Sequence, residues 1–195
     1  MRAPHPLAGI HDAVLEFLRG RDDAVLYGAQ AVNAYVDEAR MTQAVDIAST
    51  RAPELAVELR GFLNARLHIA VRVREVREGP GYRIHQVRKP KNRHLVDVRP
   101  IDAWPPMQRV KQVLVVTPPE FIAGKVRAHV RRWGKPKAGT DRRDLALLLL
   151  TFPELKTEEG PVAERLRAAG AADDITTAWK ELVAQEIEKD AFWIS

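Results

Sequence analysis

Hydrophobic residues recur every three or four positions in several segments of the chain, which is the spacing of one buried helix face. In the first such segment Ile10, Val14, Phe17 and Leu18 share a face, and Pro53 suits the first turn of a later helix. The helices predicted from this spacing cover residues 7–19, 29–38, 53–63, 117–133, 140–150, 162–169 and 173–189.

Short apolar runs and runs with a period of two predict strands in the first part of the chain. Glycine and proline at residues 78–81 separate two alternating runs, which indicates a hairpin. The predicted strands cover residues 24–27, 44–47, 68–76, 82–87, 95–98 and 112–116. This order of helices and strands predicts an α+β fold in which helices cover a mixed sheet.

The character of the chain changes after Val116, where a strong helix start appears. Thr117 is predicted to cap the helix, Pro118 suits its first position, and Glu120 stands where a capping box places its carboxylate. We therefore expect a sheet-bearing half over residues 1–116 and a C-terminal helical half over residues 117–195, packed as one unit.

The composition excludes some classes of function but does not identify one. The formal net charge is +5 and the isoelectric point is near 9.7, which is compatible with a nucleotide or nucleic-acid partner. The chain has no cysteine, so disulfides, thiolate metal sites and a cysteine nucleophile are excluded. The longest purely aliphatic run, residues 145–150, is too short to span a bilayer, and we expect a cytoplasmic protein with no membrane partner.

Candidate chemistry gathers around a glycine and two aspartates. Gly28 stands at a predicted strand-to-helix turn, where the backbone approaches a ligand closely and helix N–H groups face phosphates. Asp46 lies on the next predicted strand and Asp97 on a later one. Carboxylates that share one face of a sheet can hold divalent metal ions for attack on a triphosphate.

In this pattern the chain resembles the nucleotidyltransferase superfamily, and most closely the AbiEii/AbiGii toxin family. That family has a glycine-led turn before an Arg-x-Thr-x-Asp-Ile-Asp strand and a third acid on a later strand. Beyond Gly28, the matching residues are Arg40, Thr42, Asp46 and Asp97. Two positions depart from the family pattern: Ala44 replaces the first aspartate, and Ala29 lacks the hydroxyl that often follows the glycine.

The resemblance covers roughly residues 23–150 and continues into the helical half. Family members follow the last strand with Pro-Glu, a helical lysine, a basic stretch and an Asp-Leu helix. The corresponding residues here are Pro119, Glu120, Lys125, Arg131, Arg132, Lys137, Asp141, Asp144 and Leu145. The resemblance implies that Lys125 and Arg132 meet nucleotide phosphates, together with Gly28, Ala29, Arg40 and Thr42.

The resemblance also implies the activity. Asp46 and Asp97 would be the catalytic and metal-binding residues, and without an acid at Ala44 they would hold one Mg²⁺ ion at most. We expect a nucleotide-binding protein with impaired or absent transfer activity. The alternative is an active AbiEii-like toxin that modifies RNA such as tRNA. A nucleoside triphosphate, RNA and a cognate antitoxin or other protein are the partners implied.

Other interpretations of these residues stay open on the sequence. Asp46 can be a strand-end residue that bonds a turn, and Asp97 can form a surface ion pair with Arg93 or Arg99. Lys125 and Arg132, with His129 between them, fit the solvated face of an amphipathic helix. The basic run at residues 88–93 is either a solvated loop or a contact for RNA phosphates, so a plain RNA-binding module is a third candidate.

Overall fold

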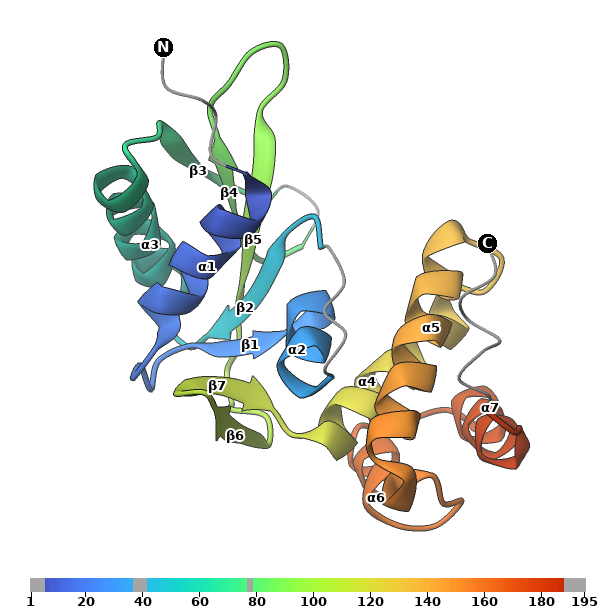
Figure 1. The fold of residues 1–195 in the computed structure, drawn as a ribbon. Coiled ribbons are helices and arrows are strands. Elements are labelled where there is room, and N and C mark those ends of the chain that lie inside the picture. The colour runs from blue at the N-terminus through green and yellow to red at the C-terminus, as the bar shows by residue number, and fades with distance from the viewer. Residues whose placement is uncertain (1–5, 37–41, 77–78, 188–195) are drawn as a thin grey trace. The chain divides into compact units, whose positions relative to one another are not determined.

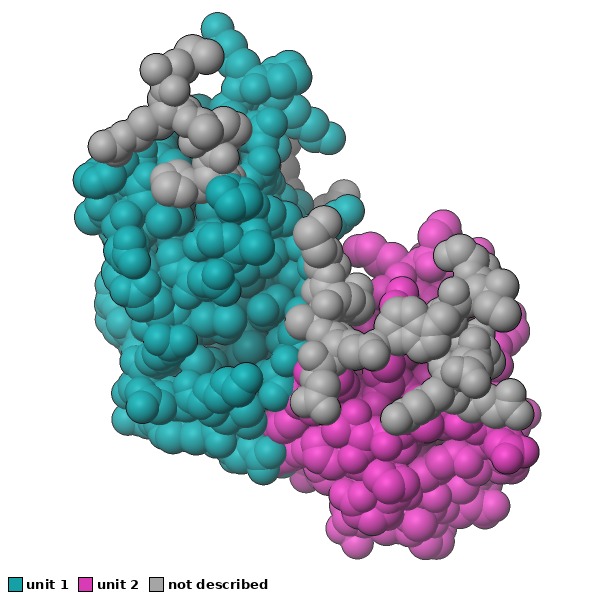
Figure 2. All heavy atoms as spheres, viewed as in Figure 1, with its two compact units in different colours: residues 1–34, 38–116 teal, residues 35–37, 117–195 magenta. Residues whose placement is uncertain are grey.

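The computed structural model describes residues 6–36, 42–76 and 79–187, and Figure 1 shows its ribbon. The chain divides into two compact units, which Figure 2 colours separately. One unit contains residues 1–34 and 38–116, and the other contains residues 35–37 and 117–195. Arg40 and Glu78, which the sequence placed in a binding strand and a hairpin turn, lie outside the described residues.

The first unit contains a seven-stranded mixed sheet in the order β3-β4-β5-β2-β1-β7-β6. Its strands are β1 (Val25–Tyr27), β2 (Val45–Ser49), β3 (Val71–Glu75), β4 (Tyr82–Gln86), β5 (Arg93–Pro100), β6 (Met107–Val110) and β7 (Val113–Val116). The pairs β2–β5 and β1–β7 are parallel, and the other neighbouring pairs are antiparallel. The expected α+β class is therefore confirmed.

Helices α1 (Leu7–Leu18) and α3 (Ala52–Leu67) enclose the core of this unit. Helix α3 packs against β2, β3, β4 and β5, while α1 packs against α3 and β7. Alternate strand residues such as Ile47, Ile84 and Val96 have no exposed surface, which matches the two-residue period of a strand with one covered face. The intervening residues point to the opposite face of the sheet, where the candidate site lies.

Strand β6 was missed from the sequence, and β7 begins at Val113 rather than at Gln112. A two-residue turn joins these strands, and both of its residues, Lys111 and Gln112, have positive φ angles of 48° and 68°. Hairpin turns with two positive φ angles usually carry Asn-Gly or a similar pair. Because Lys-Gln lacks that signature, a hairpin could not be predicted here from the sequence.

The second unit is helical. It contains α4 (Pro118–Arg131), α5 (Pro136–Thr151), a short 3-10 turn at Pro153–Leu155, α6 (Pro161–Ala168) and α7 (Asp173–Ala184). Helix α4 packs against α5, α6 and α7, and the buried core of the unit includes Ile122, Leu145, Leu148, Val126 and Trp179. Every helix in the described part of the chain is too short or too polar to cross a membrane.

The predicted capping box at the start of α4 does not form. Thr117 occupies the N-cap position, but its side chain makes no capping hydrogen bond. The Glu120 carboxylate instead accepts a hydrogen bond of 2.6 Å from Arg165 Nε on α6. Glu120 therefore forms an ion pair with α6 in place of the predicted hydrogen bond to the backbone at the start of α4.

Candidate functional site

The corner between β1 and α2 (Gly28–Tyr35) is built on a residue that has to be glycine. Gly28 has a φ angle of +70°, a left-handed conformation that side chains disfavour. A Cβ atom at this position would also lie 2.0 Å from Oδ2 and 2.7 Å from Cγ of Asp46. The Asp46 carboxylate therefore lies directly against the Gly28 backbone, at the N-terminus of a helix whose first N–H groups have no partner within the helix.

Asp46 and Asp97 face each other across two neighbouring strands. They are direct register partners in the parallel pair β2–β5, so their side chains leave the same face of the sheet. In the antiparallel pair β1–β2, Tyr27 is the partner of Asp46. Tyr27, Asp46 and Asp97 therefore lie side by side on three neighbouring strands, whose Cα atoms are about 5 Å apart from one strand to the next.

Asp97 already has an arginine and a histidine as partners in the structure. Arg83 Nε donates a hydrogen bond of 2.9 Å to Asp97 Oδ1, and His94 Nε2 lies 3.1 Å from Oδ2. Partial burial by itself raises the pKa of Asp97, but the contacts with His94 and Arg83 outweigh it and the pKa lies below its ordinary value. The ion-pair partner is thus Arg83 of β4, rather than Arg93 or Arg99.

A β-bulge brings His94 to this face. The consecutive residues Ile84 and His85 of β4 pair with Val96 and His94 of β5, so Leu95 is one extra residue in β5. Residues three apart in a regular strand point to opposite faces, and the extra residue reverses that relation for His94 and Asp97. Sequence reasoning missed His94 because a bulge has no signature in this strand.

Tyr27 adds an aromatic ring beside the two acids. Burial raises its pKa to about 12, and the charges of Asp46 and Asp97 act in the same direction against a lowering by Arg99. The guanidinium of Arg99 lies 5.4 Å from the centre of the Tyr27 ring. The phenol therefore stays protonated at neutral pH. Arg83 and His94 were not assigned to this site from the sequence, and Arg99 was considered only as an ion-pair partner of Asp97.

The segment that leads into β2 is held by hydrogen bonds within the same unit. Thr42 is buried, and its hydroxyl donates to Gln30 Oε1 of α2 at 3.1 Å and lies 3.4 Å from His11 Nδ1. Ala44 stands two residues before Asp46, at the end of this segment, and is partly exposed. Ala29 is the second residue of α2. The nucleotide-binding role of Thr42 and Ala29 stays a prediction.

Lys125 and Arg132 belong to the helical unit, where carboxylates surround them. Lys125 Nζ lies 2.7 Å from Asp144 Oδ2 and 3.2 Å from Asp141 Oδ1. Arg132 Nη1 lies 2.8 Å from Asp141 Oδ2. Lys125 and both aspartates are buried, so Lys125 is not on a solvated helix face. Their contact with phosphates stays a prediction, and it would require these carboxylates to give up their partners.

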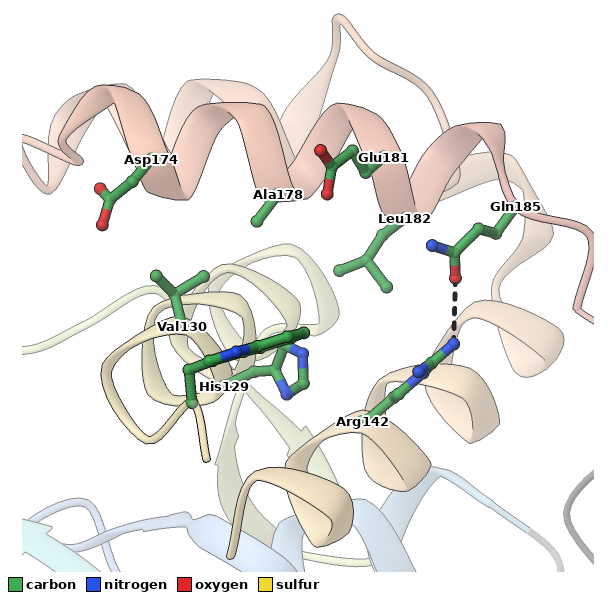
Figure 3. Close-up of a pocket in the computed structure, with 9 residues that line it drawn as sticks. His129, Val130, Arg142, Asp174, Ala178, Glu181, Leu182 and Gln185 are labelled. Atoms are coloured by element: carbon green, nitrogen blue, oxygen red, sulfur yellow. Dashed lines mark hydrogen bonds between the residues drawn. The ribbon is translucent and has the colours of Figure 1, made fainter. Parts of the chain in front are cut away.

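The helical unit contains a small pocket of about 220 Å³ between α4, α5 and α7. Figure 3 shows Asp174, Ala178, Glu181 and Leu182 on α7 above His129 and Val130 on α4. Arg142 of α5 donates a hydrogen bond of 3.3 Å to Gln185 at one end. Among the residues predicted to bind nucleotide or metal, those that the structure describes do not line this pocket.

The donor set limits what metal ion the sheet face can hold. Within residues 6–36, 42–76 and 79–187, no three His, Asp or Glu side chains are grouped so that they could bind a metal ion. Asp46 and Asp97 supply two carboxylates, which are ligands that Mg²⁺ accepts when phosphates and waters complete its shell. Asp46 and Asp97 could therefore supply carboxylate ligands to one such ion.

The sequence matches no protein-family model and no curated protein. Solved structures are similar in fold. The polyadenylate synthase of Megavirus superposes with a TM-score of 0.60 at 13% identity, over 75% of this chain and 32% of that chain. JHP933 from Helicobacter pylori has a TM-score of 0.55 at 11% identity, over 93% of this chain and 90% of that chain.

A structure from Helicobacter pylori that is assigned as a nucleotidyltransferase has a TM-score of 0.55 at 12% identity, over 91% of this chain and 90% of that chain. This chain spans about a third of the Megavirus enzyme and nearly all of the bacterial structures. The nucleotidyltransferase fold expected from the sequence is confirmed.

Proposed function

We propose that this protein binds a nucleoside triphosphate at the Gly28 corner and that its transfer activity is impaired or absent. The observation that carries the proposal is the placement of Asp46. Its carboxylate lies against the Gly28 backbone, and Asp46 is the register partner of Asp97 in the β2–β5 pair. Ala44 supplies no third carboxylate. Phosphates bind at the first N–H groups of helices that follow such glycine turns.

Asp46 and Asp97 are the residues that would hold Mg²⁺, and the ion would neutralise phosphate charge when bound. A carboxylate at the Ala44 position would add oxygen ligands and a negative charge. Its absence leaves too few ligands for a second ion. Loss of a metal that activates the attacking oxygen costs several kcal/mol of transition-state stabilisation, a rate loss of about a thousandfold or more.

The partners of Asp97 support the same proposal. Arg83 forms an ion pair with this carboxylate and His94 lies beside it, so a divalent ion has to compete with a guanidinium for it. The guanidinium of Arg83 could also offset the charge of a phosphate that binds beside Asp97. This arrangement favours nucleotide binding over metal-dependent chemistry.

The second candidate is an active nucleotidyltransferase of the AbiEii toxin type that modifies RNA such as tRNA, with a cognate antitoxin as its protein partner. The in-register pair of Asp46 and Asp97 favours it, since two carboxylates on one face can still hold one ion. It predicts turnover that depends on both residues.

Nucleotide binding and transfer have to be measured separately. Isothermal titration calorimetry with ATP, GTP, CTP and UTP, with and without Mg²⁺, tests the first. Incubation with labelled triphosphates, Mg²⁺ or Mn²⁺, and total tRNA tests the second. We expect binding to at least one nucleotide, weakened at least fivefold by Gly28→Val, and no incorporation above background.

Asp12→Ala is the matched control for Asp46→Ala, because Asp12 is an exposed aspartate on α1. Incorporation by the wild type and by Asp12→Ala that disappears in Asp46→Ala would establish the active alternative. Absence of binding to all four nucleotides would overturn the proposed nucleotide site itself.

A further inference from the structure

The face of the sheet that carries Asp46 and Asp97 also carries a group of arginines and histidines. In the register of β3 and β4, Arg72 pairs with His85 and Arg74 pairs with Arg83, so these residues share one face. Arg83 pairs with Asp97 of β5, which extends the same face to the candidate site. Side chains of register partners leave a sheet on the same side.

β5 adds an arginine and a histidine to this face. Arg99 lies two residues after Asp97 and is the register partner of Ala48, so it points to the same side. His94 reaches this side through the bulge at Leu95. We call the set Arg72, Arg74, Arg83, His85, His94 and Arg99 the basic face.

The basic face is accessible and its charge is not balanced by acids of the same face. Arg72, Arg74 and Arg99 are exposed, and the Arg83 side chain keeps 43% of its surface exposed. The acids on these strands of this face are Asp46 and Asp97. The pKa of His85 is lowered first by burial and then by His94, Arg83 and Arg74, which reflects a positive local potential.

The positive charge continues into the turn between β4 and β5. Arg88, Lys89 and Lys91 of this turn are exposed, and the turn joins the strands that carry Arg83 and Asp97. The cations therefore extend from the edge strand β3 to β5 and from the turn toward Asp97, a length that exceeds one nucleotide. Strand spacing of about 4.8 Å places Arg72 and Arg74 about 14 Å from β2.

We propose that the basic face binds single-stranded RNA through its phosphates and leads the strand toward Asp46 and Asp97. The RNA-binding surface is argued from the sheet geometry, and only its connection to the site at Asp46 and Asp97 rests on the proposed function. A flat sheet face offers no helix or ribbon to enter a duplex groove, which favours a single strand. The imidazole rings of His85 and His94, with centroids 5.4 Å apart, provide flat surfaces for bases beside the arginines.

The salt dependence of binding gives a number to test. Single-stranded binding loses about 0.7 units of log affinity per log unit of salt for each phosphate neutralised. Arg72→Gln with Arg74→Gln removes two exposed cations of the basic face, so the slope should become shallower by about 1.4. The affinity at 50 mM salt should fall by at least about tenfold.

Fluorescence anisotropy with a labelled 12-nucleotide oligouridylate, titrated at 50, 100 and 200 mM salt without nucleotide, measures both quantities. The matched control is Arg19→Gln with Arg60→Gln, which removes the same charge from exposed positions at the end of α1 and on α3. We expect the control to bind within twofold of the wild type. Thermal melts verify that both double variants are folded. If the variant of Arg72 and Arg74 is not folded, Arg74→Gln alone replaces it.

Three results would overturn the proposal: no binding by the wild type, equal losses in the two double variants, or tighter binding to an RNA duplex of the same length. Because RNA binding is measured without nucleotide and nucleotide binding without RNA, failure of this surface and failure of the nucleotide site give different results.

Discussion

Replacement of Gly28 by alanine perturbs the candidate site through two separate effects. The first is the backbone, since the φ angle of +70° costs an alanine about 1–2 kcal/mol. The second is the Asp46 carboxylate, because the new Cβ would lie 2.0 Å from Oδ2, far inside van der Waals contact. Asp46 must turn away, and a displaced rotamer with disturbed packing costs about 1–3 kcal/mol more.

Gly20→Ala isolates the backbone effect. Gly20 has a φ angle of +73°, but no atom lies within 4 Å of the position its Cβ would take. Both substitutions also remove the same conformational freedom from the unfolded chain, so this contribution cancels in the comparison. We expect Gly20→Ala to cost about 1–2 kcal/mol and Gly28→Ala about 2–5 kcal/mol.

Urea unfolding and thermal melts measure the difference. For a chain of this length each kcal/mol lowers the melting temperature by about 2–4 °C, so Gly28→Ala should melt several degrees below Gly20→Ala. In an Asp46→Ala background the two closest atoms are gone, and the excess cost of Gly28→Ala should shrink, although the Asp46 Cβ contact of 2.9 Å remains. Equal destabilisation by the two alanines would refute the contact between Asp46 and the glycine corner.

Other predictions concern charge. The contact with Arg21 is the main cause that lowers the pKa of Asp23 to about 2, so Asp23→Asn should cost about 1 kcal/mol at pH 7, after discounting for solvent screening. A lowered carboxyl pKa stabilises the folded protein at pH values above the pKa of the unfolded chain, and this stabilisation is lost as the pH falls to the folded pKa. The urea midpoints of Asp23→Asn and the wild type should therefore converge between about pH 4 and pH 2. Lys125→Met should cost about 3–5 kcal/mol in urea unfolding, because it removes the cation that pairs with the buried Asp144 carboxylate. A loss below about 1 kcal/mol with weaker nucleotide binding would instead support a phosphate contact. Ala44→Asp combined with Arg83→Gln should raise Mn²⁺ affinity, measured by electron paramagnetic resonance, by more than Ala44→Asp alone, and no gain from either would contradict the proposed metal position.

Much of the fold could be predicted because the spacing of hydrophobic residues and the positions of glycine and proline agree along most of the chain. The buried stripes of α1 and α3 and the alternation in β3 and β4 are strong local signals, and the structure contains each of these elements. Strand β6 was missed because its turn residues, Lys111 and Gln112, lack the glycine or asparagine that usually accepts positive φ.

The candidate site could be predicted only in part, for a physical reason. Gly28, Asp46 and Asp97 were found because glycine at a turn and acids on strands are visible in one sequence. Arg83 and His94 were not, because their positions depend on pairing between β4 and β5 and on the bulge at Leu95. Side chains that meet through tertiary register leave no local pattern in the sequence.

The charges of this face explain how nucleotide binding and transfer chemistry can separate. A triphosphate needs positive charge wherever it binds, and fixed cations such as Arg83 and Arg99 supply it without a metal ion. Activation of an attacking oxygen is different, because a guanidinium neither lowers the pKa of a bound hydroxyl as a metal does nor accepts its proton. Under the proposed function, Ala44 in place of a carboxylate and the pairing of Asp97 with Arg83 would leave groups of the first kind and weaken those of the second. The proposal therefore predicts that binding outlasts transfer chemistry at this site.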